Sequence, residues 1–212
     1  MNTDEQSEQL HRELKGKVGI ESKAEVKNKE DLSLVYTPGV AHVSSVIAGS
    51  IDEVYELTGK GNTIAVVSDG SAVLGLGNIG PEAALPVMEG KSLILKEFAG
   101  VNCVPIVLRS QDKEDTISTV KNIAPGFGGI ILEDFKAPDC FEIERRLIEE
   151  LDIPVIHDDQ HGIAIVVLAG LINSLNLRSG EVRKDVRIVV SGAGAAGIAT
   201  AKLLTVYGFT DI

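Results

Sequence analysis

Tryptophan is absent from the sequence, and only two cysteines, Cys103 and Cys140, occur among its 212 residues. Two cysteines give no disulfide framework, so a reducing, cytoplasmic setting is the simplest interpretation. The first residues are polar and acidic, which does not fit a signal or transit peptide. No apolar run approaches the roughly 20 residues that a membrane-spanning helix needs. These absences predict a cytoplasmic protein without a membrane segment.

Positive charge is also scarce. Lys and Arg together number 20 against 31 Asp and Glu, which gives a formal net charge of -11. A net anion is repelled by nucleic acids and anionic membranes, so we expect neither as a partner. A local basic cluster can still bind a small anionic substrate. With 44% hydrophobic residues, the chain can form the core of one domain plus part of another.

Short apolar runs rich in Val and Ile alternate with segments of helical periodicity. The runs predict strands over residues 63–68, 104–108, 129–132, 153–156 and 186–190. The remaining periodic segments predict helices over residues 1–15, 81–98, 113–123, 137–150, 162–177 and 195–207. This alternation is typical of βαβ units and predicts an α/β fold with a parallel sheet.

A charged stretch at residues 178–184 separates the apolar helix 162–177 from a new strand, glycine turn and helix, so we place a domain boundary there. We expect residues 1–177 to form a parallel-sheet domain for substrate and metal. Residues 178–212 would begin a Rossmann-type dinucleotide-binding domain, with helix 162–177 buried between the two parts. The chain ends about fifteen residues after the last glycine, so we expect this second domain to be incomplete.

Two acidic pairs follow directly on two of the predicted strands. Glu133 and Asp134 follow one strand, and Asp158 and Asp159 follow the next. Because parallel strands end at the same edge of a sheet, we expect these carboxylates to lie together where α/β folds bind ligands. Mg²⁺ and Mn²⁺ prefer oxygen ligands of this kind. Either pair alone fits solvated loop residues or helix caps, but both at matching strand ends favour a metal site.

A glycine turn between the last predicted strand and the last predicted helix fits the G-x-G-x-x-G pattern. The first glycine permits a tight turn, the second lets a pyrophosphate approach the backbone, and the third allows close packing. An acidic residue that would distinguish NAD from NADP lies beyond Ile212, so the sequence leaves both open. The expected cofactor-binding residues are Gly192, Gly194, Ala195, Ala196 and Gly197.

Tyr36 and Lys91 are candidate proton carriers. Tyr36 precedes a Thr-Pro-Gly turn that can hold its phenol, and Lys91 is bordered by apolar residues that can move its pKa toward neutrality. A packing tyrosine and a solvated lysine are the alternatives. His157 and His161 also allow a zinc site, but the acids between them suit a harder cation better.

Six segments, in order along the chain, together have the pattern of a known family. They are Tyr36-Thr37-Pro38-Gly39-Val40-Ala41, Ser68-Asp69-Gly70, Leu74-Gly75-Leu76-Gly77-Asn78-Ile79-Gly80, Pro86-Val87-Met88-Glu89-Gly90-Lys91, Leu132-Glu133-Asp134-Phe135 and His157-Asp158-Asp159-Gln160-His161-Gly162. These segments closely resemble the signature segments of malic enzymes, specifically the short bacterial type. The resemblance implies an NAD(P)-dependent enzyme that converts malate to pyruvate and CO₂ with Mg²⁺ or Mn²⁺.

The resemblance also implies roles for individual residues. In this family, the matching positions are metal ligands (Glu133, Asp134, Asp159), the general base (Lys91), the general acid (Tyr36), a second acid beside the metal (Asp158) and the cofactor turn (Gly192, Gly194, Gly197). One departure concerns an arginine that larger members carry just before the Leu-Gly-Leu-Gly segment. Here that neighbourhood reads Ser71-Ala72-Val73, so the group that holds the substrate carboxylate stays open.

Two other functions remain open at this point. Malolactic conversion, which releases lactate, fits the same residues. A non-catalytic domain that binds metal and mediates subunit association fits a chain with an incomplete dinucleotide unit, and we expect the 212-residue chain alone to be inactive. We expect malate and pyruvate as ligands and a homodimer or higher homo-oligomer, in which Tyr36 and Lys91 serve either one active site or two.

Overall fold

The computed structural model describes residues 2–177 and 185–212. Within them, the centre is a parallel sheet of four strands in the order β2-β1-β3-β4. The strands are β1 (Thr63–Ser68), β2 (Asn102–Val107), β3 (Ile130–Leu132) and β4 (Val155–His157). The expected α/β fold with a parallel sheet is therefore confirmed.

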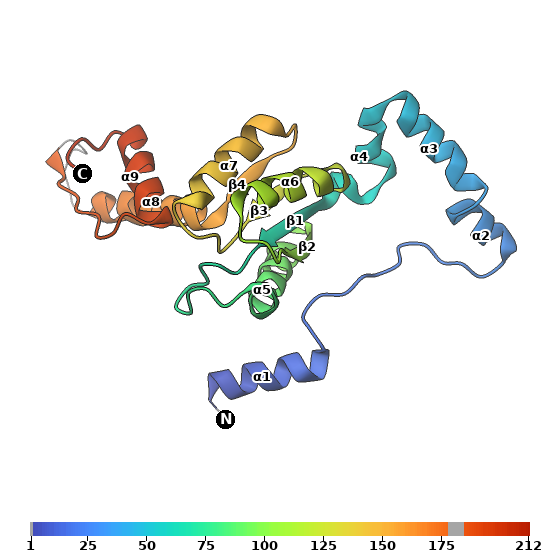
Figure 1. The fold of residues 1–212 in the computed structure, drawn as a ribbon, viewed down its shortest axis with the longest axis horizontal. Helices are drawn as coiled ribbons and strands as arrows, with labels where there is room; N and C mark the ends of the chain where they lie inside the picture. The colour runs from blue at the N-terminus through green and yellow to red at the C-terminus, as the bar shows by residue number, and fades with distance from the viewer. Residues whose placement is uncertain (1, 178–184) are drawn as a thin grey trace.

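One helix occupies each crossover between strands. Helix α5 (Pro81–Ala99) joins β1 to β2, α6 (Lys113–Ile123) joins β2 to β3, and α7 (Asp139–Glu150) joins β3 to β4. Helix α5 packs against β1 and β2, while α6 and α7 lie together on the other face (Figure 1). The chain thus leaves the neighbouring strands β1 and β3 in opposite directions along the sheet. Open α/β sheets bind ligands outside the carboxyl ends of such a pair.

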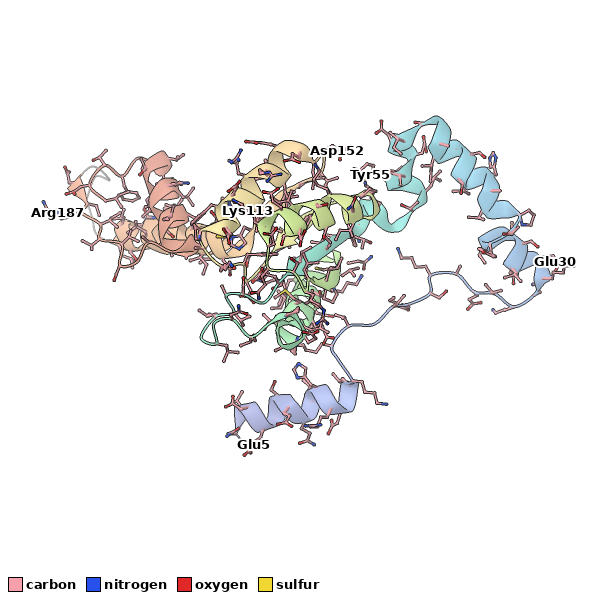
Figure 2. All side chains as sticks on the ribbon, in the orientation of Figure 1. Glu5, Glu30, Tyr55, Lys113, Asp152 and Arg187 are labelled. Atoms are coloured by element: carbon pink, nitrogen blue, oxygen red, sulfur yellow. The ribbon has the colours of Figure 1, made fainter. Side chains whose placement is uncertain are left out.

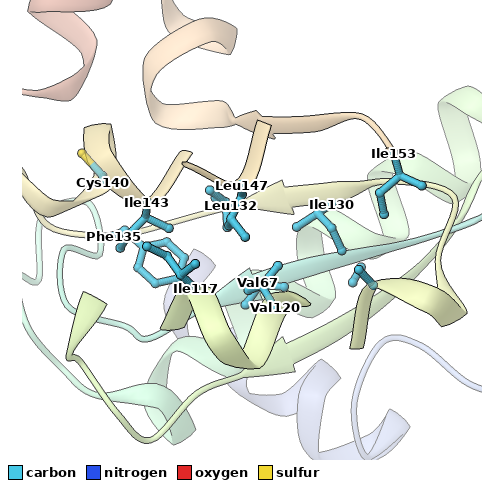
Figure 3. Close-up of a cluster of buried hydrophobic side chains, with 12 residues drawn as sticks. Val67, Ile117, Val120, Ile130, Leu132, Phe135, Cys140, Ile143, Leu147 and Ile153 are labelled. Atoms are coloured by element: carbon cyan, nitrogen blue, oxygen red, sulfur yellow. The ribbon is translucent and has the colours of Figure 1, made fainter. Parts of the chain in front are cut away.

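The main hydrophobic cluster fills the space between the sheet and helices α6 and α7 (Figure 3). Alternate strand residues reach it, such as Val67 from β1 and Leu132 from β3, because side chains along a strand point to opposite faces. The neighbouring Val66 is equally buried on the α5 side, as expected for a parallel sheet covered on both faces. The cluster holds α7 firmly over β3 and β4. Its helical members are Ile117, Val120, Cys140, Ile143 and Leu147.

Residues before the sheet form helices that pack little against it. These are α1 (Thr3–Leu14), α2 (Lys29–Val35), α3 (Gly39–Gly49) and α4 (Val54–Leu57), with short 3-10 turns at Ile51–Glu53 and Gly59–Asn62. None of the residues in these four helices is buried. We call residues 29–57 the helical arm; Figures 1 and 2 show α2 and α3 standing away from the sheet. The first helix confirms the prediction, whereas α3 was not foreseen.

The C-terminal part corrects the prediction of a strand over residues 186–190. Arg187 makes an isolated bridge with Asp211, and Ile188 N donates to Asp211 O. A strand needs a neighbouring strand for its backbone groups, and none of residues 185–212 supplies one. The helix that follows, α9 (Ala195–Tyr207), has the predicted bounds. The predicted domain boundary at residues 178–184 lies outside the described residues.

Helix α8 (Asp158–Leu177) also differs from expectation. It begins at Asp158, at the end of β4, and not at residue 162. Only Gln160 and Ala164 are buried, so α8 is not the buried connecting helix that its composition suggested. Its first turns contact β4, Glu144 of α7 and Lys91 of α5, and α9 packs against it further along. Apolar composition alone misled the prediction, because many apolar side chains of α8 are not covered by other described residues.

Two helical stretches, Lys29–Gly49 and Asp158–Leu177, are long and apolar enough to cross a membrane by length and composition alone. The expectation that no apolar segment approaches that length is therefore wrong. The first stretch is interrupted at Tyr36–Pro38, where α2 ends and α3 has not begun. The second begins with two acidic residues and packs against α9. The core helices of soluble proteins can have the same length and composition, so these two properties do not make either stretch a membrane span.

Candidate active site

Glu133 and Asp134 lie at the carboxyl end of β3, beside the end of β1. Strand alternation turns Glu133 toward the α5 face, opposite to Leu132. Asp134 has a φ of 59°, a left-handed conformation that ends the strand. Its carbonyl accepts a hydrogen bond from Ala72 N at 2.9 Å, which ties it to the loop after β1. Both acids therefore sit at the point where the chain reverses direction along the sheet.

Asp158 and Asp159 form the first turn of α8, directly after β4. The backbone N–H of Asp134 donates to Oδ2 of Asp159 at 2.8 Å. This bond joins the ends of β3 and β4, so the structure brings the two acidic pairs together at one edge of the sheet. Because Asp158 and Asp159 lie on a helix and not on a loop, their two carboxylates are fixed relative to each other.

Lys91 lies between the two acidic pairs. Its Nζ is 2.6 Å from Oδ2 of Asp158 and 3.0 Å from Oε1 of Glu133. Burial favours the neutral amine, but the hydrogen bond to Asp158 and the charge of Glu133 outweigh it and raise the pKa of Lys91. The expectation that burial moves this pKa toward neutrality is therefore wrong for this arrangement. Lys91 carries a proton here and balances two carboxylates.

Two buried carboxylate oxygens have no hydrogen-bond partner, namely Oε2 of Glu133 and Oδ2 of Asp134. Burial raises the pKa of Glu133 to about 7, although Lys91 opposes the shift. Burial and the charge of Asp159 raise the pKa of Asp134 to about 6. Unpaired anionic oxygens of this kind are costly unless a cation joins them. Their chemistry fits a hard divalent cation.

The present side-chain arrangement does not yet form a complete cation site. In the part of the chain that the structure describes, no three His, Cys, Asp or Glu side chains are placed to hold a metal ion together. Two contacts account for this. The ammonium of Lys91 occupies the space between Glu133 and Asp158, and Asp159 directs Oδ2 to the backbone of Asp134. The zinc alternative with His157 and His161 gains no support. Nε2 of His157 lies next to Asp159, and Nε2 of His161 lies next to Glu144.

The fully buried His157 lies beside Asp159: its Nε2 is 3.2 Å from Oδ2 of Asp159, although neither ring nitrogen makes a hydrogen bond. Burial works against ionisation of Asp159, but His157 and the N–H of Asp134 outweigh it and hold the pKa of Asp159 below its ordinary value. Sequence reasoning treated His157 only as a zinc candidate. In the structure its ring lies against an acid two residues later in the sequence.

Glu144 and Gly162 were missed by sequence reasoning. Glu144, on α7, is 6% exposed and bonds to residues around the start of α8. Gly162 lies one helical turn after Asp158, and a Cβ there would be 2.2 Å from Oδ1 of Asp158. The spacing of Asp158 and Gly162 is a signal that could have been read, because residues four apart share a helix face. Nothing local marks Glu144, whose partners are 13 and 16 residues away in the sequence.

Tyr36 is not brought to this site within one chain. It caps α2 in the helical arm, and its side chain is 66% exposed. Figure 1 shows the end of α2 far from α5, which carries Lys91, and from β3. The two candidate proton carriers are therefore separated in the single chain.

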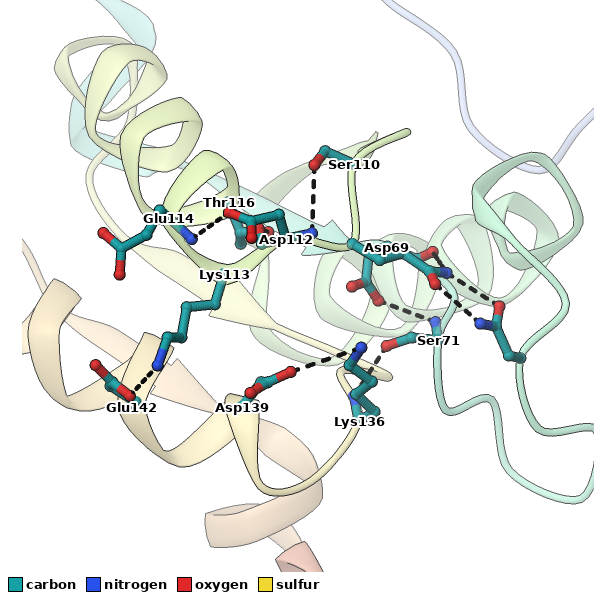
Figure 4. A network of polar contacts seen from close by, with 12 residues as sticks. Asp69, Ser71, Ser110, Asp112, Lys113, Glu114, Thr116, Lys136, Asp139 and Glu142 are labelled. Atoms are coloured by element: carbon teal, nitrogen blue, oxygen red, sulfur yellow. Dashed lines mark hydrogen bonds and ion pairs between the residues drawn. The ribbon is translucent and has the colours of Figure 1, made fainter.

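Polar contacts order the loops that surround the carboxyl edge of the sheet (Figure 4). The buried Asp69 accepts from Ser71 N at 2.9 Å, and Ser71 Oγ accepts from Lys136 N at 2.9 Å. Lys113 pairs with Glu142 and so ties α6 to α7. These bonds connect the loop after β1 with the loop after β3, on either side of the acidic residues.

The glycine turn has the geometry that the pattern predicts for its first and third glycines. Gly192 has a φ of 116°, which residues with a Cβ rarely adopt. A Cβ at Gly197 would lie 2.2 Å from the carbonyl oxygen of Gly192, so only glycine fits there. Gly194 caps α9, and Ala195 and Ala196 are its first two residues. The N–H groups at this helix start have no side-chain cap, as in turns that bind phosphate.

Comparisons with known proteins point to one family. A family model described as malic enzyme, N-terminal domain, matches residues 15–117. A bifunctional malic/malolactic enzyme from Bacillus subtilis (strain 168) is 55% identical over 212 residues, which is 100% of this chain and 52% of the relative. An NAD-dependent malic enzyme from Geobacillus stearothermophilus is 58% identical over 197 residues, 93% of this chain and 41% of the relative. The chain thus spans about half the length of these curated relatives, or less.

A solved structure is similar over almost the whole chain. The crystal structure of an NAD-dependent malic enzyme from Thermotoga maritima matches with a TM-score of 0.93 and 49% identity. The match covers 99% of this chain and 54% of that chain. The N-terminal domain model, the relatives and the solved structure thus agree: the chain is similar to malic enzymes over almost its whole length.

Proposed function

We propose that the complete protein oxidises malate and releases CO₂ to give pyruvate, with NAD or NADP as the electron acceptor and a divalent cation as cofactor. The observation that carries this proposal is the position of Lys91 between Glu133 and Asp158, beside buried carboxylate oxygens that lack partners. The curated relatives include NAD-dependent and NADP-dependent malic enzymes, which supports the reaction and leaves the choice of nucleotide open.

Glu133, Asp134 and Asp159 would hold Mg²⁺ or Mn²⁺, with Asp158 as a second acid beside them. When bound, the cation supplies Lewis acidity that withdraws electrons from the substrate carbonyl. The three carboxylates provide the oxygen ligands that both ions prefer, and two of them, Glu133 and Asp134, are buried away from water. The hydrogen bond from Asp134 N keeps Asp159 next to the other two acids.

Lys91 would act as the general base that takes the hydroxyl proton of malate as hydride leaves C2 for the nicotinamide. It must first lose its own proton. If a cation neutralised the charges of Glu133 and its neighbours, the pKa of Lys91 would fall, and a larger fraction of its amine would be free of a proton and able to accept one. The loss of CO₂ from the resulting keto acid leaves an enol that needs a proton at C3.

Tyr36 would supply that proton, and we propose that it does so in the active site of a second copy of the chain. The arm that carries it has no buried residue in α2 or α3. The exposed large hydrophobic side chains of its residues 29–49 are Leu32, Leu34, Val35, Tyr36 and Val40. A two-fold dimer would bury these side chains and give each Lys91 a tyrosine from the partner.

The glycine turn would bind the pyrophosphate of the dinucleotide, with Gly192, Gly194 and Gly197 shaping the backbone and Ala195 and Ala196 offering N–H groups. In this proposal the turn starts a Rossmann-type domain that further residues complete. The two free cysteines, Cys103 and Cys140, suit the reducing cytoplasm in which we expect the protein to work.

A malolactic reaction is the second candidate, favoured by the relative named as a bifunctional malic/malolactic enzyme. It would use the same residues but keep the reduced cofactor bound and release lactate. The third candidate is a non-catalytic domain that binds a metal ion and mediates subunit association.

One assay separates the three candidates. The complete protein is incubated with malate, Mn²⁺ and either NAD or NADP, and reduced cofactor, pyruvate and lactate are all measured. Pyruvate in equal amount to free reduced cofactor supports the main proposal, and lactate without free reduced cofactor supports the second. Mn²⁺ binding without turnover would leave only the third.

A further inference from the structure

Glu144 is a buried carboxylate that the proposed reaction does not use. Its Oε1 accepts from the backbone N–H of His157 at 2.7 Å and lies 2.9 Å from Nε2 of His161. Its Oε2 accepts from Nε2 of Gln160 at 2.8 Å. All three partners belong to the short segment that turns β4 into α8. A single side chain from α7 therefore contacts the residue before Asp158 and the two residues after Asp159.

The N–H groups at the start of α8 need a hydrogen-bond acceptor from outside the helix. The first N–H groups of a helix lack intrahelical partners, and a side chain within the first turn usually accepts from them. In a capping box, the third helical residue accepts from the N–H of the capping residue. Here the capping residue is His157 and the third helical residue is Gln160, whose amide donates to Glu144 instead. Glu144 takes the bond from His157 N and replaces the missing half of the box.

We propose that Glu144 is a positioning residue for the cation ligands, acting through the first turn of α8. Its partners are His157, Gln160 and His161, and not Asp158 or Asp159 themselves. It fixes the backbone immediately before Asp158 and the side chain immediately after Asp159, so the direction in which both carboxylates leave the helix depends on it. This inference rests on the proposed function, because it assumes that Asp159 binds a divalent cation.

A role in stability alone predicts something different. A buried carboxylate that only holds α7 against α8 would lower the melting temperature when neutralised and leave the affinity of the folded protein for a cation unchanged. A positioning residue changes the affinity of protein that is still folded. Groups that orient metal ligands from outside the ligand sphere typically account for about 10- to 100-fold in affinity.

The test is the dissociation constant of Mn²⁺, measured by calorimetric titration of the complete protein with Glu144→Gln. The amide keeps the shape of the side chain but replaces one of its two acceptor oxygens with a donor, which then faces either the Gln160 amide or the pair formed by His157 N and His161. We expect Mn²⁺ to bind about 10- to 100-fold more weakly, with folded protein verified by its melting curve. Glu149→Gln removes the same charge from an exposed position on α7 and should leave the constant unchanged.

A double variant keeps the proposal testable if Glu144→Gln folds poorly. In Glu144→Gln with Gln160→Glu, the donor and acceptor are exchanged while the total charge is retained. Gln at 144 can accept from His157 N and donate to Glu at 160, so we expect most of the Mn²⁺ affinity to return. If the folded double variant still binds Mn²⁺ as weakly as Glu144→Gln, the proposal is wrong.

Asp159→Asn separates the failure of this inference from failure of the proposed function. If Asp159→Asn abolishes tight Mn²⁺ binding and Glu144→Gln does not alter it, only the inference is wrong. If the unmodified protein and Asp159→Asn bind Mn²⁺ equally, the proposed cation site is wrong and the inference falls with it. Weaker binding in both variants, with recovery in the double variant, supports both.

Discussion

Nζ of Lys91, on α5, lies 2.6 Å from Oδ2 of Asp158, the first residue of α8. The two residues are 67 positions apart in the sequence and meet only because β1, β3 and β4 end at the same edge of the sheet. The contact keeps Lys91 protonated in the absence of a cation. It therefore couples the protonation of the proposed base to the state of the proposed ligand sphere.

Replacing the base tests its role directly. Lys91→Ala should lower kcat for malate-dependent reduction of NAD(P) by about 10²- to 10⁴-fold, the usual contribution of a general base. Added small primary amines should restore part of the rate. Lys96→Ala is the matched control, because Lys96 is on the same helix but donates to Asn102 outside the site. Equal activity in the two variants would mean that another group accepts the proton.

Cation affinity should depend on pH. A proton on Glu133, with its pKa of about 7, competes with the cation for the same oxygen. Because this pKa is raised, the protonated form already dominates below about pH 7, where an ordinary glutamate would be ionised. We expect the Mn²⁺ dissociation constant to rise by about tenfold for each pH unit below 7 per proton displaced. Titrations between pH 6 and about 8 would check this. A flat profile would place the cation elsewhere.

The two-copy active site predicts complementation. Tyr36→Phe and Lys91→Ala should each be inactive alone. If each site takes Tyr36 from one copy and Lys91 from the other, a mixed dimer contains one site with both changes and one unchanged site. Random exchange should then recover about a quarter of the unmodified activity. Activity that stays at zero after verified subunit exchange would show that both residues come from the same chain.

The core prediction concerns helix α7. Leu147 is fully buried against β3 and β4, whereas its neighbour Ile148 is 52% exposed. Leu147→Ala should lower the free energy of unfolding by about 2–5 kcal/mol. Ile148→Ala, the same kind of truncation one residue away, should change it by less than about 0.5 kcal/mol. Urea unfolding of the two variants measures the difference.

The sequence was sufficient for the sheet because its strands are buried on both faces. Such strands read as continuous apolar runs, and the acidic pairs that follow two of them mark the edge. Glu133 and Asp159 could therefore be assigned to one edge from the order of strands and acids along the chain. The bond from Asp134 N to Asp159 could not, because it depends on the left-handed backbone of Asp134 and on α8 starting without a loop.

Other features depend on partners that are remote in the sequence. Residues 186–190 have the composition of a strand, but a strand exists only beside another, so their apolar run was misleading. Tyr36 was recognised as a candidate, yet no local sequence pattern indicates that the helical arm extends away from the sheet. Glu144 looks like any acidic residue of an amphipathic helix until His157, Gln160 and His161 are seen around it.

Strand β4 passes into α8 without an intervening loop, and this has a mechanical consequence. A helix of 20 residues is a stiff rod about 30 Å long. One end of this rod carries Asp158 and Asp159, and its side rests against α9, the helix that begins at the glycine turn. A tilt of α9 would therefore be transmitted along this rod to the backbone of Asp158 and Asp159. In the proposed function, this contact would link the position of the nucleotide-binding turn to the direction of the two acids.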